Sequence, residues 1–233
     1  MRIENNEDKD WIEYINGFSD NYNDRVYSNS TGLVMNKGHQ SCEEKFAPSD
    51  HFDNVLEIGS GTGEHFKFVR HSFREYTFTD CDHNNLEKIN NNLSNDIRFN
   101  KLKFEVMDAR KLDFKDESFD RIIATHLLEH LTHPHLVIKE WKRVLRKGGT
   151  LSILIPTDPG VLWKMGRYFT TRRNAIKKGI NYDYIMAREH INSCNNLISL
   201  LNYYFPNSES HFWPLKVLPS IDLNLFYIFH SIK

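Results

Sequence analysis

Residues 54–65 read Asn-Val-Leu-Glu-Ile-Gly-Ser-Gly-Thr-Gly-Glu-His, and this stretch decides the fold. The apolar run Val55–Ile58 predicts a buried strand, and the alternating Gly59, Gly61 and Gly63 predict a tight loop after it. Glycines in such a loop let backbone N–H groups approach a ligand closely. The stretch therefore predicts a ligand-binding turn at the end of the first strand.

The segment that follows points to an adenosine-bearing ligand. A helix is expected over Glu64–His71, and a second strand over Tyr76–Thr79 ends on Asp80, about twenty residues after the glycines. A carboxylate at that position can accept hydrogen bonds from both hydroxyls of a ribose. Asp82 is an alternative, although Asp80 directly ends the apolar alternation.

The glycine spacing disfavours a dinucleotide. Dinucleotide sites read G-x-G-x-x-G and hold a pyrophosphate at a helix N-terminus. Here the spacing is G-x-G-x-G, and Glu57 and Glu64 flank it. Two carboxylates would repel a pyrophosphate, whereas they suit the sulfonium and ammonium groups of S-adenosylmethionine.

The length and composition of the chain limit the classes of protein to which it can belong. The 233 residues suit one α/β domain, and the net charge of −1 argues against nucleic acid as a partner. No apolar stretch approaches the ~18 residues of a membrane span, and no signal peptide is visible, so we expect no integral membrane segment. Cys42, Cys81 and Cys194 show no metal or disulfide spacing, which is typical of the cytoplasm.

Strands and helices alternate along most of the chain, which indicates βαβ units and a parallel sheet. Further strands are expected over Leu102–Met107, Phe119–Thr125 and Thr150–Ile155, helices over Asn84–Leu93, Leu136–Leu145 and Asn195–Phe205, and two final strands over Ser210–Val217 and Leu223–His230. The prediction is a Rossmann-like α/β fold. It has a seven-stranded, mostly parallel sheet, helices on both faces and an antiparallel C-terminal hairpin.

Two segments fall outside this alternation. Residues 1–50 are predicted to form an N-terminal helical cap, with one helix carrying Trp11, Tyr14, Phe18, Tyr22 and Tyr27 and a second near Lys37–Phe46. Residues 51–233 would form a single domain, in which residues 157–192 are an irregular insertion.

By these motifs the chain resembles the class I S-adenosylmethionine-dependent methyltransferases, specifically the group with a methyltransferase-11 type domain. Val55–His65 looks like the first family motif, residues 107–112 the third, residues 125–131 the fourth, and residues 144–149 the stretch before the fifth strand. The resemblance implies that S-adenosylmethionine is held by Glu57, Gly59, Ser60, Gly61, Gly63, Asp80, Cys81, Asp108, Ala109, Thr125 and His126. Asp108 would hold the adenine amino group, although a helix N-cap is its structural alternative.

Three histidines are candidate general bases. His126 lies just beyond the fourth strand, where the family holds the methionine end of the cofactor, and His190 opens the last helix. His39 lies in the N-terminal segment. The run from His126 to His130 is similar to an E-x-x-E-H stretch of relatives acting in ubiquinone biosynthesis, which has been linked to a divalent metal. Since His126 replaces the first Glu, a hard cation loses an oxygen ligand, and no metal is expected.

The stretch from Pro159 to Tyr182 contains no acidic residue but six basic ones, interleaved with aromatic residues. It follows the fifth strand, where the family places substrate-recognition insertions. A solvated face is the alternative to a binding surface. The predicted substrate-binding residues are Arg167, Arg172, Arg173, Arg188 and Asn192.

These features predict a cytoplasmic methyltransferase acting on oxygen of a small, anionic metabolite, such as a phosphorylated or sugar-linked one. The alternatives are N-methylation of a small molecule or phospholipid headgroup, a non-catalytic protein that binds S-adenosylmethionine, and an NAD-dependent oxidoreductase. The same basic and aromatic stretch could also contact an anionic membrane surface.

Overall fold

The structure, a computed structural model, describes residues 8–15 and 30–233. Its strands are β1 (His51–Ile58), β2 (Ser72–Asp80), β3 (Leu102–Val106), β4 (Phe119–Thr125), β5 (Leu145–Pro156), β6 (Ser208–Trp213) and β7 (Phe226–Ile232). Its longer helices are α2 (Ser30–Glu43), α3 (His83–Leu93), α4 (Pro134–Val144), α5 (Val161–Arg167), α6 (Arg173–Lys177), α7 (Tyr182–Glu189) and α8 (Cys194–Tyr204).

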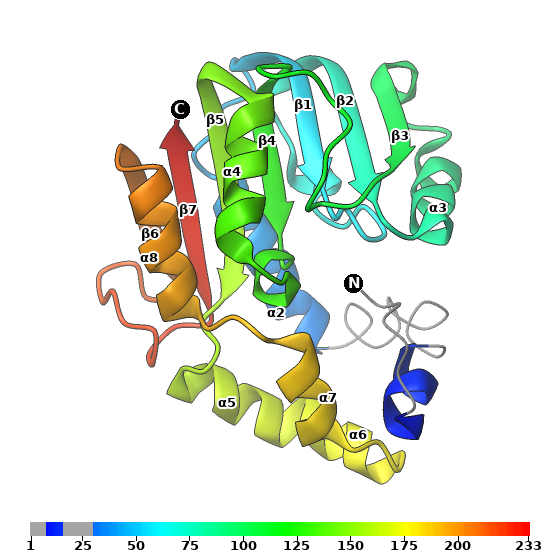
Figure 1. Cartoon of the computed structure of the whole chain (residues 1–233), viewed down its shortest axis with the longest axis vertical. Coiled ribbons are helices and arrows are strands. Elements are labelled where there is room, and N and C mark those ends of the chain that lie inside the picture. The colour runs from blue at the N-terminus through cyan, green and yellow to red at the C-terminus, as the bar shows by residue number, and fades with distance from the viewer. Residues whose placement is uncertain (1–7, 16–29) are drawn as a thin grey trace.

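The strands form one seven-stranded sheet in the order β3-β2-β1-β4-β5-β7-β6, which confirms the predicted fold class (Figure 1). Strands β1 to β5 pair in parallel, and β7 is antiparallel to both β5 and β6. The predicted hairpin is confirmed, with each of its strands a few residues away from the expected bounds. In the register, Glu57 pairs with Phe78 on one side and Ile123 on the other. The segments that follow β1, β2 and β4 therefore meet at one edge of the sheet.

The helix expected over Glu64–His71 is wrong. Only Phe66–Phe68 form a single 3-10 turn there, and β2 already begins at Ser72. Few residues separate β1 from β2, and the glycines among them have left-handed backbones, so no room is left for an α-helix.

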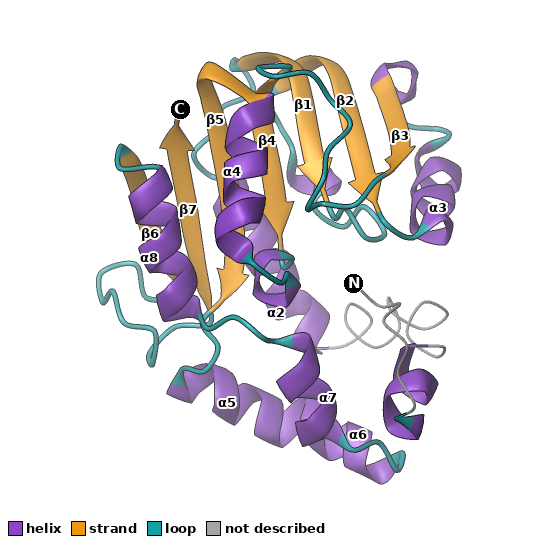
Figure 2. Ribbon diagram, viewed as in Figure 1, coloured by secondary structure: helices purple, strands orange, loops and turns teal. Residues whose placement is uncertain are grey.

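Two helical layers cover the sheet (Figure 2). On one face, α4 and α8 pack on a core that includes Leu56, Ile122 and Ile153. On the other face, α3 and the 3-10 turn cover the side of Val55 and Phe78, and α2 packs against β5 and β7. Each strand contributes alternate side chains to the two faces, as the pleat requires.

The second of the two expected N-terminal helices is present with different bounds. The second helix is α2, Ser30–Glu43, rather than Lys37–Phe46, and it buries Met35, His39 and Cys42. Residues 9–15 are helical, with Trp11 buried, while Phe18, Tyr22 and Tyr27 lie outside the described residues. A boundary at residue 50 stays a prediction.

The insertion at 157–192 is helical rather than irregular. Helices α5 and α6 are joined by a π-helical turn, Tyr168–Arg172, into one continuous helix, and α7 follows. This helix lies beyond the carboxyl edge of the sheet (Figure 1). We call residues 157–192 the carboxyl-edge cap.

Candidate active site

The glycine loop is tied to the end of β2 by Asp80. Gly59, Gly61 and Gly63 all have positive φ angles, between 53° and 80°. The Gly61 N–H donates to Asp80 Oδ2 at 2.8 Å, and Ser60 N donates to the Thr79 carbonyl at 2.9 Å. Burial raises the pKa of the Asp80 carboxyl, and hydrogen bonds from Asp82 N–H and Gly61 N–H oppose this. The sequence-predicted loop and acid are therefore brought together.

The three glycines of the loop have different structural roles. A Cβ at Gly59 would lie 2.7 Å from the Leu127 side chain, and one at Gly63 would press on Ile89. A Cβ at Gly61 would meet nothing within 4 Å. Gly59 and Gly63 thus allow close packing, whereas Gly61 faces open space beside Asp80, where a ligand can lie.

Asp80 and its alternative, Asp82, lie in different environments. Asp82 is the N-cap of α3, and its side chain accepts from Asn84 N–H at 3.0 Å. Asp108 follows β3 and holds the Arg110 guanidinium in a bidentate pair, which lowers the pKa of its carboxyl. Asp108 is half exposed and caps no helix, and its neighbour Ala109 is buried. Cys81 is exposed.

The Glu57 side chain does not face the glycine loop. Because Leu56 and Ile58 point toward α4 and α8, Glu57 points to the opposite face of the sheet. It is 1% exposed, accepts from the Tyr76 hydroxyl at 2.5 Å, and has a pKa raised by burial. Its carboxylate therefore contributes no surface to the glycine loop.

His126 turns the chain at the end of β4. It has a left-handed backbone (φ 53°), follows Thr125 directly, and its N–H donates to the Leu154 carbonyl at 2.8 Å. This turn sends Leu127 against Gly59. The His126 ring is nearly buried, and its Nε2 has no hydrogen-bond partner among the described residues. Burial lowers its pKa to about 3, so the imidazole is neutral at physiological pH.

A buried chain of side chains leads from His126 to α2. The His39 ring lies edge-on to His126 at 5.3 Å, and its Nδ1 is 3.2 Å from His65 Nδ1. His65 Nε2 is 2.9 Å from Glu43 Oε1, and Glu43 pairs with Arg121 of β4. Burial raises the pKa of Glu43, but Arg121 and His65 outweigh it and hold it well below the ordinary value. His39 is thus brought to His126, as a buried residue of the core.

Three carboxylates gather around His130 and His190. Glu129 Oε1 lies 3.9 Å from His126 Nδ1 and 3.7 Å from His130 Nε2, and Glu129 Oε2 has no hydrogen-bond partner among the described residues. His130 Nδ1 is 3.2 Å from a Glu189 carboxylate oxygen. Burial lowers the pKa of His130, but the Glu189 hydrogen bond and the charge of Glu129 outweigh it and raise that pKa to about 9.

The third carboxylate, Asp158, connects this cluster to the cap. Asp158 Oδ2 lies 2.9 Å from His190 Nδ1 and 2.6 Å from Arg167 Nη1. Burial raises its pKa, but the His190 hydrogen bond and Arg167 outweigh it and lower it. Sequence reasoning missed Asp158 and Glu189, because no motif marks them and only the fold of the cap brings them here. We call Glu129, Glu189, Asp158, His130 and His190 the acid–imidazole cluster.

The cap borders a cavity of about 540 Å³ next to this cluster. Its lining includes the acidic Asp158 and Asp183, His190, and the basic Lys164, Arg167 and Arg172, together with Tyr168 and Tyr182. Arg167 is paired with Asp158, and Arg172 with Asp183. The lining therefore mixes acidic and basic side chains, and Lys164 is a cation in it without an ion-pair partner among the described residues.

The predicted substrate residues differ in their availability. Arg172 holds Asp183 in a bidentate pair, and Arg188 lies over the Trp11 ring at 4.2 Å. Arg173 is exposed and does not line the cavity. The amide of Asn192 donates to the carbonyls of Leu128 and Leu131 and so holds the turn after β4.

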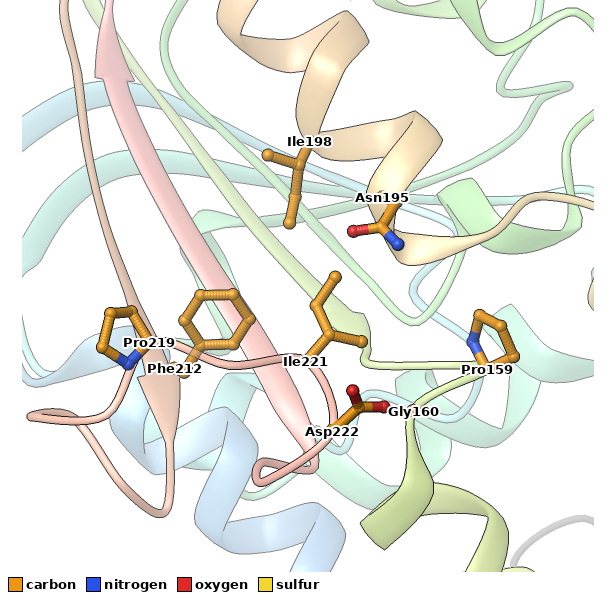
Figure 3. A pocket seen from close by; sticks show the side chains of 8 residues that line it. All are labelled: Pro159, Gly160, Asn195, Ile198, Phe212, Pro219, Ile221 and Asp222. Atoms are coloured by element: carbon orange, nitrogen blue, oxygen red, sulfur yellow. The ribbon is translucent and has the colours of Figure 1, made fainter.

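A second cavity, of about 410 Å³, lies between α8, β6 and the segment before β7 (Figure 3). Ile198, Phe212 and Ile221 line it, and Asp222 and Asn195 are at its rim. None of its lining residues belongs to the glycine loop or the acid–imidazole cluster.

The residues around the loop fit S-adenosylmethionine. Gly61 leaves open space beside the carboxylate of Asp80, and the unpartnered His126 Nε2 lies at the same edge of the sheet. In residues 8–15 and 30–233, no three His, Cys, Asp or Glu side chains are arranged to hold one metal ion.

Comparisons with known proteins agree with this geometry. Residues 56–153 match the family model described as a methyltransferase domain. The chain is 35% identical over 137 residues to a phosphatidylethanolamine N-methyltransferase of Cereibacter sphaeroides, covering 58% of this chain and 66% of that protein. It is 30% identical over 114 residues to the 27-O-demethylrifamycin SV methyltransferase of Amycolatopsis mediterranei, covering 47% of this chain and 42% of that one.

Solved structures share the fold over nearly the whole chain. A SAM-dependent methyltransferase of Thermotoga maritima superposes with a TM-score of 0.57 at 19% identity, covering 96% of this chain and 98% of that one. The curated relatives named above match over less than two thirds of this chain, and over no more than 66% of their own length.

Proposed function

The chain belongs to the methyltransferase domain family of the class I S-adenosylmethionine-dependent methyltransferases, and we propose that it methylates the amine of a small acceptor that also carries a phosphate. The sulfonium cofactor supplies an electrophilic methyl group. The chain's own residues would orient the acceptor and exclude water, and orientation alone can be worth about 7–11 kcal/mol.

The observation that carries this proposal is the mixed charge in and around the cavity. An acceptor ammonium is attracted by Asp158 in the lining and by Glu129 and Glu189 of the adjoining acid–imidazole cluster, three carboxylates against the cations Arg167 and protonated His130. A phosphate is attracted by Lys164, which lines the same cavity and has no ion-pair partner among the described residues. A zwitterion matches this mixed charge, and the phosphatidylethanolamine N-methyltransferase that the chain resembles is named for such a substrate.

We therefore propose nitrogen, the alternative acceptor atom, rather than the expected oxygen. An amine must lose a proton before it attacks. With a pKa of about 3, His126 is a weak base and acts as a hydrogen-bond acceptor that aims the amine. Glu129 is the stronger base of the two, since burial raises the pKa of its carboxyl.

A screen of acceptors tests the reaction. Release of S-adenosylhomocysteine is measured with phosphoethanolamine, with vesicles containing phosphatidylethanolamine, and with glycerol phosphate, which offers hydroxyls only. Turnover is expected with an amine acceptor and not with the hydroxyl compound. Glu129→Gln is expected to lower kcat by about 10²–10⁴-fold with cofactor affinity unchanged. Preferred turnover of glycerol phosphate would refute the amine proposal.

A matched pair of variants tests phosphate recognition by Lys164. Lys164→Ala is expected to raise the acceptor KM, because Lys164 lines the cavity. Lys178→Ala, also exposed and in the same cap but away from the cavity, is expected to leave it unchanged. Equal KM values for both variants would argue against phosphate recognition here.

A second pair tests the cofactor site by calorimetry with S-adenosylmethionine. Asp80→Ala is expected to reduce affinity at least tenfold, since it removes the carboxylate beside Gly61. Asp82→Ala loses the α3 N-cap, about 1 kcal/mol of stability, and should keep the affinity. Wild-type affinity in Asp80→Ala would overturn the assignment.

A further inference from the structure

We propose that the outward face of the helix formed by α5, the π-helical turn and α6 docks on an anionic phospholipid bilayer. The inference goes beyond the proposed reaction, because it concerns the surface of the cap outside the cavity, although Lys164, Tyr168 and Arg172 border both. The helix runs without a break from Val161 to Lys177, about 25 Å at the usual rise per residue.

Only one side of this helix is held by the protein. The Trp163 ring packs on Phe226 at 5.8 Å, and Arg167 reaches inward to Asp158. These contacts determine which side of the helix is left facing outward.

The outward side is apolar. Large hydrophobic side chains recur on it at helical spacing, and each is at least half exposed: Val161 55%, Met165 51%, Tyr168 58%, Phe169 66% and Ile176 50%. A surface helix of a globular protein normally turns its apolar stripe to the core. Here the stripe faces solvent, opposite Trp163, which marks an interaction surface.

The charges beside the stripe identify its partner. Lys164, Arg173, Lys177 and Lys178 are exposed, and none has an ion-pair partner within the described part of the chain. Asp183 of α7 is exposed and already paired with Arg172, which lies within the stripe, and the exposed Asp222 accepts a hydrogen bond from the Val161 N–H at 3.1 Å. An apolar stripe bordered by unpaired cations complements a surface that is apolar below and negatively charged above, which is an anionic bilayer.

The helix would lie on the membrane rather than cross it. Among the described residues no helix is long and apolar enough to span a bilayer. Lys164, Tyr168 and Arg172 line both the stripe and the cavity, so docking would bring the cavity to the level of the lipid headgroups.

Vesicle flotation of the full chain, without cofactor or acceptor, tests the proposal. Binding is expected to vesicles of phosphatidylcholine with about 30% phosphatidylglycerol, to weaken as salt is raised, and to be at least tenfold weaker on phosphatidylcholine alone. Met165→Ser with Phe169→Ser, and separately Lys177→Glu with Lys178→Glu, are each expected to reduce binding at least tenfold.

Matched variants keep the outcome decisive. Ile97→Ser removes a side chain that is 95% exposed elsewhere, and Lys115→Glu with Lys139→Glu reverses two exposed charges outside the cap. These should bind like the wild type, and all variants should keep wild-type circular dichroism. Equal loss in the controls, absence of vesicle binding, or a concentration-dependent dimer disrupted by Phe169→Ser would overturn the proposal. Because no turnover is measured, none of these results bears on the methyl transfer.

Discussion

The two faces of the sheet are built on different principles. Under α4 and α8 the strands present Leu56, Ile122 and Ile153, all fully buried. Under α2 the neighbouring positions present Arg121 and Ser152, which are also fully buried. Adjacent residues of the same strand thus belong to an apolar core on one face of the sheet and to a buried polar network on the other.

The polar face is organised around one ion pair. Arg121 holds the carboxylate of Glu43, its guanidinium lies 3.7 Å from the Phe46 ring centre, and it reaches Ser152 Oγ. His230 Nδ1 lies 3.1 Å from the same hydroxyl. Buried ion pairs add little net stability but are costly to break. We infer that the face under α4 and α8 stabilises the fold through its apolar core, whereas the opposite face, besides apolar clusters of its own, has a polar network that holds α2, and with it His39, in position.

The largest effect should come from breaking the ion pair. Arg121→Met leaves Glu43 buried without its cation, so the free energy of unfolding should fall by about 3–5 kcal/mol. The double variant Glu43→Leu with Arg121→Met should recover much of that loss. Urea denaturation measures both, and a double variant that is less stable than Arg121→Met would contradict the interpretation of the pair.

On the apolar face, truncation of one buried side chain should lower the free energy of unfolding by about 2–5 kcal/mol. No second substitution is expected to restore this loss. Leu197 of α8 is fully buried in the α4–α8 core, and Leu197→Ala leaves a cavity there. Its loss should add to that of Arg121→Met, since the two lie on opposite faces. Strong non-additivity in a double-mutant cycle would show that the faces are not independent.

Acid should weaken the polar face. Burial lowers the pKa of His230 to about 3 and that of His71 to about 4. Below pH 6.5, the ordinary pKa of a histidine, these two side chains are protonated in the unfolded chain but stay neutral in the folded one. The free energy of unfolding therefore falls as the pH drops. The expected loss between pH 6.5 and pH 5 is about 2 kcal/mol for each histidine. Urea titrations should show a flatter pH dependence in His230→Phe than in the wild type, and an unchanged slope would refute the assignment.

The smallest expected effects come from substitutions of two adjacent residues, Ser152 and Ile153. Ser152→Ala and Ile153→Val should each cost about 1 kcal/mol. Only Ser152 contacts Arg121, so only Ser152→Ala should show a coupling energy with Arg121→Met, about 0.5–3 kcal/mol. Equal coupling for both positions would mean that the two faces are not distinct in this strand.

Much of the architecture could be predicted because its signals are local. The apolar runs near Val55, Ile122 and Leu151 mark buried strands, and Gly59 with Gly61 marks the turn that carries the site. The helix expected over Glu64–His71 failed because the length of chain before β2, rather than helical propensity, decided that segment.

The candidate site was only partly predictable, since its side chains come from segments far apart in the sequence. His126 follows directly from the end of β4, whereas its neighbour His39 reaches it only because α2 packs on β5 and β7. Asp158 and Glu189 gave no signal of their own. The direction of the Glu57 side chain was not predictable from its nearness to the glycines, because the pleat determines which way it points.

The amino-acid sequence by itself determined the class of sheet, the glycine turn and the acid that ends β2, because alternation, glycine conformation and strand length act within a few residues. Tertiary structure alone decided that the buried polar side chains meet on one face and that the carboxyl-edge cap turns its apolar stripe outward. Those outcomes depend on which surfaces of distant segments are brought into contact, and no local pattern records that choice.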